Sequence, residues 1–317
     1  MNFRTATLAA CIALLSSTSA FASMSIDQIN SADPTKQQDT AAIVRLGALL
    51  GRAGASVGAI DGKMGPLTEA AIAAFRAMKG MGGGSQLDAD TWSALSADAA
   101  PAVVSYTITD EDVAFELTPP TPESFIEMAK MERLGFHSYS EAMAEKFHMA
   151  EDLLKTLNPD ADFGKAGTEI VVVATGDPLA VTVDRIEVAK ASGALRGYNG
   201  NQLVFFAPAA VGSEQTPSPE GSMSVTAIAP DPNYTFDAKN IEGATEDEVA
   251  IVPPGPNGPV GSMWIDLGKP TYGIHGTPHP EKIGSMESNG CVRLTNWDAN
   301  ALAELVTSGT TTVEFMQ

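Results

Sequence analysis

The spacing of apolar residues predicts three short helices near the start of the chain. Apolar side chains recur at helical spacing from Ile43 to Leu50. A second helix is expected to begin at Thr68, which would act as its N-cap, and a third, short helix is expected over residues 87–95. The pattern therefore favours a small three-helix bundle over residues 41–97.

A proline-rich stretch and a second set of elements follow. Residues 118–122 read Thr-Pro-Pro-Thr-Pro, which is typical of a semi-rigid spacer. The other expected elements are a strand over residues 103–108, helices near Ser140 and Glu151, and a β-branched strand over residues 168–173. This order predicts a linker and a small α+β module over residues 98–177, with the prolines in an insertion.

Short strand patterns dominate from residue 178 onward. Turn residues separate them, and they lie at residues 181–183, 186–188, 203–206, 223–225, 250–252 and 263–267. Tyr234 and Phe236 suit either a groove wall or ordinary packing. Such strands predict a mainly β domain over residues 178–317, as an antiparallel sandwich or barrel. The expected fold class is therefore multidomain.

The first 22 residues have the pattern of a secretory leader. Arg4 supplies the positive end, residues 8–15 the apolar core, and Ala20-Phe21-Ala22 a small-x-small cleavage site. Residues 23–40 are polar and unpatterned, which predicts a flexible lead. An alternative is lipidation of Cys11, because Leu-Ala-Ala-Cys resembles a lipoprotein box. Either way we expect export to the periplasm or cell envelope.

Charge narrows the range of partners. The 317 residues include 39 Asp and Glu against 19 Lys and Arg, for a net charge of −20. That balance argues against nucleic acid and against electrostatic docking on anionic lipid. It does not identify a partner, and the sequence gives no indication of the oligomeric state.

One stretch concentrates the residues that could do chemistry. Cys291 is the only cysteine outside the leader, and His275 precedes it by sixteen residues. A thiol becomes a useful nucleophile beside a base or a positive charge. Period-two alternation in the strand that ends at His275 would turn this imidazole toward a groove. The amides of Gly290 and Cys291 could form an oxyanion hole, and Arg293 could fix a carboxylate.

Two other interpretations of these residues remain. A lone cysteine is often a small buried hydrophobe, although Ser, Asn, Gly and Arg surround Cys291 here. His275 and His279 form an H-x-x-x-H pair that could suggest zinc. Gly276 and Pro278 would break the helix that such a pair needs, so neither a metal site nor a cofactor is expected.

The elements His-Gly-Thr and Ser-Asn-Gly-Cys-Val-Arg, at this spacing, resemble the YkuD-type catalytic domain of bacterial L,D-transpeptidases. The resemblance implies that Cys291 is the nucleophile and His275 its base. Many family members have histidine where this chain has Asn289. The resemblance also implies that Arg293 helps to hold the substrate. We expect Cys291, His275 and Gly290 to act in catalysis, and the residues expected to bind substrate are Arg293, Ser288, Asn289, Gly276, Thr277 and Tyr272.

The two preceding units carry further resemblances. L-x-x-x-L, D-G-K-M-G-P-x-T-x-x-A-I-x-x-F and T-W-S-A-L resemble the small peptidoglycan-binding domain, which often has Gln where Arg76 stands. Residues 98–177 resemble a LysM module, which grips glycan, split by an insertion. An unrelated three-helix unit and a purely structural spacer are the respective alternatives.

Together these resemblances imply a cell-wall L,D-transpeptidase. Such an enzyme transfers the acyl group of a stem tetrapeptide to an amine, which forms 3→3 cross-links or attaches an envelope protein, and carbapenems acylate it. The expected partners are peptidoglycan stem peptides and glycan. The alternatives are a hydrolase with the same site, acting as a carboxypeptidase or cutting cross-links, and a non-catalytic wall-binding scaffold.

Overall fold

Four helices form the N-terminal part of the chain. The computed structural model describes residues 24–212, 218–238, 249–285, 288 and 290–316. The helices are α1 (Ile26–Ser31), α2 (Thr40–Arg52), α3 (Pro66–Met78) and α4 (Ala89–Leu95). The expected leader, with Cys11, lies outside the described residues. Within them, no helix combines the length and apolar character needed to cross a membrane.

Two details of these helices differ from expectation. Helix α3 begins at Pro66 rather than at Thr68, because proline suits the first helical position and Gly65 takes the N-cap. The predicted flexible lead contains α1. Ser25 and Gln28 form a capping box at its start, and Ile29 is fully buried.

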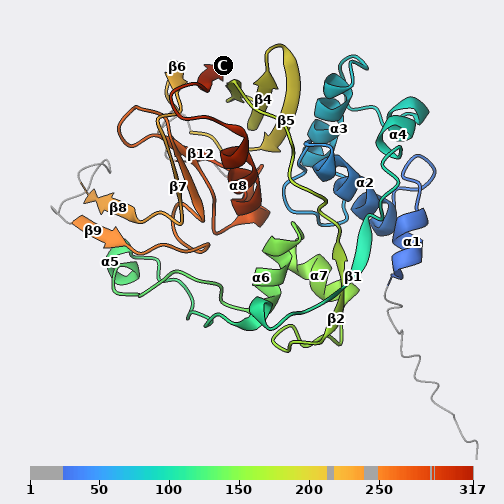
Figure 1. Ribbon diagram of the computed structural model, residues 1–317, viewed down its shortest axis with the longest axis horizontal. Coiled ribbons are helices and arrows are strands. Elements are labelled where there is room, and N and C mark those ends of the chain that lie inside the picture. The colour runs from blue at the N-terminus through green and yellow to red at the C-terminus, as the bar shows by residue number, and fades with distance from the viewer. Residues whose placement is uncertain (1–23, 213–217, 239–248, 286–287, 289, 317) are drawn as a thin grey trace, which may run out of the picture.

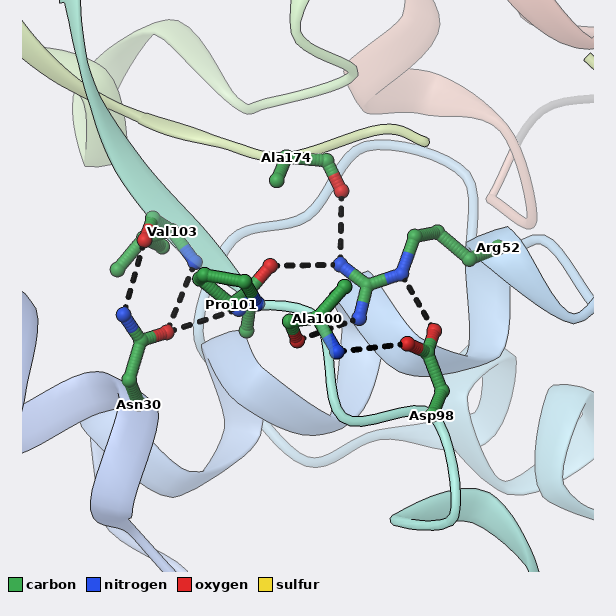
Figure 2. A network of polar contacts seen from close by, with 8 residues as sticks. Asn30, Arg52, Asp98, Ala100, Pro101, Val103 and Ala174 are labelled. Atoms are coloured by element: carbon green, nitrogen blue, oxygen red, sulfur yellow. Dashed lines mark hydrogen bonds and ion pairs between the residues drawn. The ribbon is translucent and has the colours of Figure 1, made fainter. Parts of the chain in front are cut away.

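Arg52 and Asn30 bind the chain that leaves the helices, as Figure 2 shows. The Arg52 guanidinium donates to Asp98 and to the carbonyls of Ala100, Pro101 and Ala174. Asn30 accepts from the amides of Ala102 and Val103 and donates to the Val103 carbonyl. Residues 98–103, expected to be part of a linker, are therefore fixed to the helices.

The middle part of the chain is a small α+β unit. Its elements are β1 (Val103–Thr107), η1 (Glu111–Val113), α5 (Phe125–Met128), α6 (Tyr139–Lys146), α7 (Glu151–Leu157) and β2 (Glu169–Val173). Strands β1 and β2 pair antiparallel, with Val103 opposite Val173. One hydrophobic core joins this unit to α1–α4, including Ile29, Phe75, Met143 and Leu154.

The last part of the chain is mainly β. Its strands are β3 (Arg185–Ala189), β4 (Ala194–Asn199), β5 (Gln202–Pro208), β6 (Gly221–Ser224), β7 (Ala227–Pro230), β8 (Tyr234–Asp237), β9 (Val249–Val252), β10 (Met263–Asp266), β11 (Gly273–His275), β12 (Val292–Arg293) and β13 (Thr312–Met316). Short η3 (Pro280–Lys282) and α8 (Asn296–Leu305) complete it. A second hydrophobic core fills this domain.

These strands form mixed sheets rather than the antiparallel arrangement that was expected. One sheet has the order β5-β4-β3-β13-β6 and another β12-β11-β10-β7, while β8 and β9 form a hairpin. Strands β3 and β13 run parallel, as do β11 and β12. The reason is that β13 returns to the sheet after α8, and β12 follows the long excursion from β11, so neither pair is joined by a tight hairpin turn.

Polar contacts join the two halves of the molecule, which lie side by side in Figure 1. The Ser56 amide donates to the Phe206 carbonyl, and its hydroxyl donates to Asp298. Asn296, at the start of α8, donates to both oxygens of Glu145 on α6, each at 3.0 Å. Such buried polar pairs specify one arrangement of the two halves, because each group would be left unsatisfied in any other.

Arg52→Met is expected to lower the free energy of unfolding by about 2–4 kcal/mol, because three carbonyls and Asp98 lose a charged donor. Urea unfolding followed by circular dichroism measures the change. Lys130→Met, at an exposed ion pair with Glu127, is the control and should leave the midpoint unchanged. Equal midpoints for the Arg52 variant and the wild type would show that the network is not needed.

Glu145→Gln is expected to stabilise the protein as pH rises. Burial raises the pKa of Glu145 from 4.5 to about 8, Glu141 reinforces this, and the Asn296 contact opposes it. Glu145 loses its proton near pH 4.5 in the unfolded chain but only near pH 8 in the folded chain. Between these values the folded chain binds one more proton than the unfolded chain, so wild-type stability falls as pH rises across that window. Glutamine mimics the neutral carboxyl. The variant's melting temperature should match the wild type near pH 4.5 and exceed it at pH 8; a constant difference would contradict this.

Candidate active site

The pairing of β11 with β12 brings the predicted catalytic residues onto one face. Ile274 lies opposite Val292 and His275 opposite Arg293, in parallel register. The Leu294 amide donates to the His275 carbonyl, which continues this ladder. The same register places Cys291, just before β12, beside Gly273. Because side chains alternate, Cys291, His275 and Arg293 share a face, and the fully buried Ile274 and Val292 point the other way.

His275 is held as a neutral base. Its ring is 3% exposed and stacks on Trp264, the paired residue on β10, with centroids 5.5 Å apart. Nδ1 lies 2.7 Å from the Gly276 carbonyl, which can only accept a hydrogen bond, so Nδ1 carries the proton and Nε2 a lone pair. Burial and the positive charge of Arg293 lower the His275 pKa to about 4, and the bond to Gly276 opposes them.

Cys291 is held as a thiol. Its Sγ donates to the Thr271 carbonyl at 3.3 Å. Burial raises the pKa of the Cys291 thiol, while the Gly273 amide, which donates to the sulfur, and the Arg293 charge lower it. The resting pair is therefore a thiol and a neutral imidazole rather than a thiolate–imidazolium ion pair, so the proton must move during the attack.

Thr271 and Gly273 are contacts of the thiol that sequence reasoning missed. Thr271 has φ of 72°, a conformation that is rare for a β-branched residue. This turn directs its carbonyl to the sulfur. The sequence does predict a turn at residues 268–270, but residue types alone do not show the direction in which a backbone carbonyl points. Backbone strain of this kind is common at active sites.

The loop before Cys291 is tied down by Ser288 and Ser218. Ser288 Oγ donates to the Cys291 carbonyl, and the Gly290 amide donates to Ser288 Oγ at 3.2 Å. Ser218 Oγ donates to the Gly290 carbonyl at 2.9 Å. Gly290 has φ of 106°, which requires glycine. Its amide is thus already engaged by Ser288, and the oxyanion hole of the Gly290 and Cys291 amides stays a prediction. Asn289 lies outside the described residues.

Arg293 and Tyr234 border the thiol. Arg293 is half-buried, and its Nε is buried without a hydrogen-bond partner among the described residues. The Cys291 sulfur raises the pKa of Arg293, and burial lowers it more strongly. Tyr234, on β8, has its pKa raised by burial and by Cys291 and lowered by Arg293. Tyr234 is therefore near enough to Cys291 and Arg293 to interact with them electrostatically, which favours the groove-wall interpretation.

The remaining predicted substrate contacts differ in accessibility. Gly276 packs so tightly that a Cβ would lie 2.1 Å from Asn296 Oδ1. Thr277 is buried, and its Oγ1 accepts from the His279 amide. Tyr272 is half-buried beneath the Lys269 ammonium, 4.4 Å from the ring centre. Gly276 and Thr277 thus shape the wall around His275.

His279 lies away from this arrangement. It is exposed and lies 3.5 Å from Glu281. Across the described part of the chain, no group of three His, Cys, Asp or Glu side chains is placed to hold a metal ion. A thiol, a neutral imidazole on the same face and a backbone carbonyl that fixes the imidazole tautomer define a cysteine–histidine enzyme, of the kind that works through a covalent acyl intermediate.

Comparison with known proteins agrees with this class. The model of the L,D-transpeptidase catalytic domain, YkuD, matches residues 183–314. A putative L,D-transpeptidase YkuD of Bacillus licheniformis is 31% identical over 172 residues, which cover 54% of this chain and 89% of that protein. Its Bacillus subtilis counterpart is 30% identical over 170 residues, covering 53% and 88%.

Among solved structures, an L,D-transpeptidase of Enterococcus faecium is 17% identical, with a TM-score of 0.33 over 43% of this chain and 50% of that one. The aligned region thus spans only half of that protein. The sequence relatives carry the assignment. The chain belongs to the YkuD family of L,D-transpeptidases, and its mainly β domain with mixed sheets is the catalytic domain.

The rate at which Cys291 is acylated by a carbonyl substrate should stay level from pH 7 to 5 and fall about tenfold per pH unit below 4. The reason is that His275, with a pKa near 4, cannot accept a proton once it is charged. Stopped reactions analysed by intact mass measure the rate, and circular dichroism at each pH excludes unfolding. An acid limb near pH 6.5 would contradict the buried, neutral imidazole.

Proposed function

We propose that this chain is a cell-wall L,D-transpeptidase that acts on peptidoglycan stem peptides through a thioester on Cys291. The observation that carries the proposal is the shared face of Cys291, His275 and Arg293, set by the β11–β12 register. The family assignment supports the reaction class, and the relatives' names support L,D-peptide bonds as the target.

Acylation follows from the resting state of the pair. His275 Nε2 takes the proton of the Cys291 thiol as the sulfur attacks the carbonyl between the third and fourth stem residues. The new S–C bond replaces the C–N bond, and D-alanine leaves with the proton from His275. Arg293, which borders the sulfur, is placed to hold a substrate carboxylate. The Cys291 amide stays the predicted oxyanion donor, whereas the Gly290 amide must first leave Ser288.

Deacylation by an amine closes the cycle. The acceptor amine loses a proton to His275 and attacks the thioester, an amide C–N bond forms, and Cys291 leaves and regains its proton from the imidazolium. A stem-peptide amine gives a 3→3 cross-link, and a protein amine gives attachment to the wall.

The other parts of the proposal rest on sequence patterns. We assign peptidoglycan binding to residues 41–97 and glycan contact to the LysM-like residues 98–177. The leader-like residues 1–22 support export to the periplasm or cell envelope. Acylation by carbapenems is expected, because a cysteine that accepts an acyl group from a peptide can also open a β-lactam ring.

Cys291→Ala should abolish cross-linking of purified tetrapeptide muropeptides, because no other described residue is a thiol. His275→Gln should lower the rate by ~10²–10⁴-fold through loss of the positioned base. Mass spectrometry separates the possible acceptors: dimers show transfer, and shortened monomers alone show hydrolysis. Full dimer formation by the folded Cys291→Ala protein would end the proposal.

A further inference from the structure

A loop from the N-terminal half reaches across to the catalytic domain. We call residues 118–137, between β1 and α6, the strap. Its two ends are tied together, because the Thr118 amide donates to the Phe136 carbonyl and the Thr118 hydroxyl to the Gly135 carbonyl. The strap contains the proline-rich sequence that was expected to be a spacer, and α5 lies within it.

One end of the strap is anchored by backbone contacts. The Leu134 amide donates to the Pro254 carbonyl, and the Asn257 amide donates to the Leu134 carbonyl, at 2.9 and 3.0 Å. Leu134 is fully buried. Gly255 has φ of 148°, and a Cβ there would lie 2.0 Å from the Leu134 carbonyl oxygen, so only glycine permits this approach. The contact thus depends on the strap, through the Leu134 backbone, and on the catalytic half, through the glycine at position 255.

The middle of the strap covers the hairpin that carries Tyr234. In Figure 1, α5 lies against β8 and β9. The Phe125 ring lies 5.4 Å from the Tyr234 ring and 4.8 Å from the Phe236 ring. These two residues share one face of the hairpin, and the opposite face exposes Val249 and Ile251. Phe125 thus holds the residue that borders Cys291 and Arg293.

The strap also walls a cavity that reaches the catalytic face. This cavity of about 890 Å³ is bounded by Pro120, Phe125 and Met128 of the strap, by α6 and α7, by residues 277–281 and by Arg293. Its size is in the range of small-ligand sites. Arg293 lies beside His275 in register, and its buried Nε, which has no partner among the described residues, is a donor that a ligand could satisfy.

The lining favours a cationic group over an anionic one. The carboxyl groups on its wall are those of Glu123, Glu141, Glu151, Asp152 and Glu281, together with Glu145, which burial keeps protonated and neutral at pH 7. Arg293 is the only Lys or Arg among the lining residues. Donor and acceptor stems both carry carboxylates and an amine, but only the acceptor must bring its amine, an ammonium in solution, to the thioester on Cys291. The charge of the cavity therefore matches the acceptor.

We propose that the strap forms the outer wall of the acyl-acceptor subsite, that an acceptor peptide enters there with its primary amine, and that Phe125 is a specificity-determining residue. The inference rests on the proposed transpeptidase function and deepens it. It gives the N-terminal half a part in substrate choice besides any binding to the wall.

The test separates the two half-reactions in the full-length protein. A tetrapeptide muropeptide serves as donor and a tripeptide muropeptide, which has no D-alanine to release, as acceptor. Phe125→Ala should leave the rate of thioester formation within twofold of the wild type and raise the acceptor KM about tenfold or more. Phe125→Tyr should restore the acceptor KM. Phe163→Ala, which removes another half-buried phenylalanine that packs on the N-terminal core, is the matched control and should change neither.

A second variant tests charge without touching the strap's packing. Glu123→Gln with Glu281→Gln changes two exposed carboxylates and should raise the acceptor KM several-fold, with thioester formation unchanged. An unchanged acceptor KM in both the Phe125→Ala and the double variant would overturn the inference. A slower thioester step with an unchanged acceptor KM would place the donor in this cavity and also overturn it. Failure of the wild type to form any thioester would instead reject the proposed function.

Discussion

The parallel pairing of β11 and β12 is the constraint on which the site depends. It sets His275 beside Arg293 and Cys291 beside Gly273, on the face opposite the fully buried side chains of Ile274 and Val292. A slip of one residue would turn the imidazole or the thiol into the core. The two strands are short, so β10 and α8 must hold the register from either side. Trp264 stacks on the imidazole from β10, and Asn296 of α8 packs against Gly276.

The electrostatics of the site follow from that packing. Burial of His275 and Cys291, with the Arg293 charge nearby, keeps the imidazole neutral and the sulfur protonated. A neutral pair avoids the cost of holding two charges in a buried site. In the proposed reaction, proton transfer from the sulfur to Nε2 would therefore be coupled to the attack. The Gly276 carbonyl makes this possible, because it fixes the tautomer.

The rest of the chain is more than an appendage to this domain. Ser56, Glu145 and the Leu134–Gly255 contact bind the N-terminal half to the catalytic half at three separate places. The strap is a fourth connection, because its Phe125 packs against Tyr234 of the catalytic half. The contacts of Leu134 and Phe125 with the catalytic half explain why the proline-rich sequence lies in a packed loop rather than in a spacer.

Local sequence patterns predicted many of the helices and strands. They did not predict which strands pair with each other across long stretches of sequence. The helices at residues 40–52 and 151–157 and the strands β1, β2, β3 and β5 follow from periodicity. The motif around Cys291 pointed to the family because the proposed reaction needs those residue types, a thiol, an imidazole and a guanidinium, at that spacing. Parallel pairing of β11 with β12, and of β3 with β13, depends on contacts between distant segments that leave no periodic signal.

The missed parts of the site have the same cause. The Thr271 carbonyl, the Gly273 amide and the engaged Gly290 amide are backbone groups whose direction depends on the fold. Helix α1 was missed because one buried residue, Ile29, anchors a helix too short to show periodicity. The strap was read as a spacer because its contacts lie more than a hundred residues away.

The most direct test of the central claim is the nitrogen NMR spectrum of the His275 imidazole, titrated in the resting enzyme. We expect a neutral ring at pH 7, protonated on Nδ1, that gains its second proton only near pH 4. A charged imidazolium at pH 7, paired with a Cys291 thiolate, would contradict it.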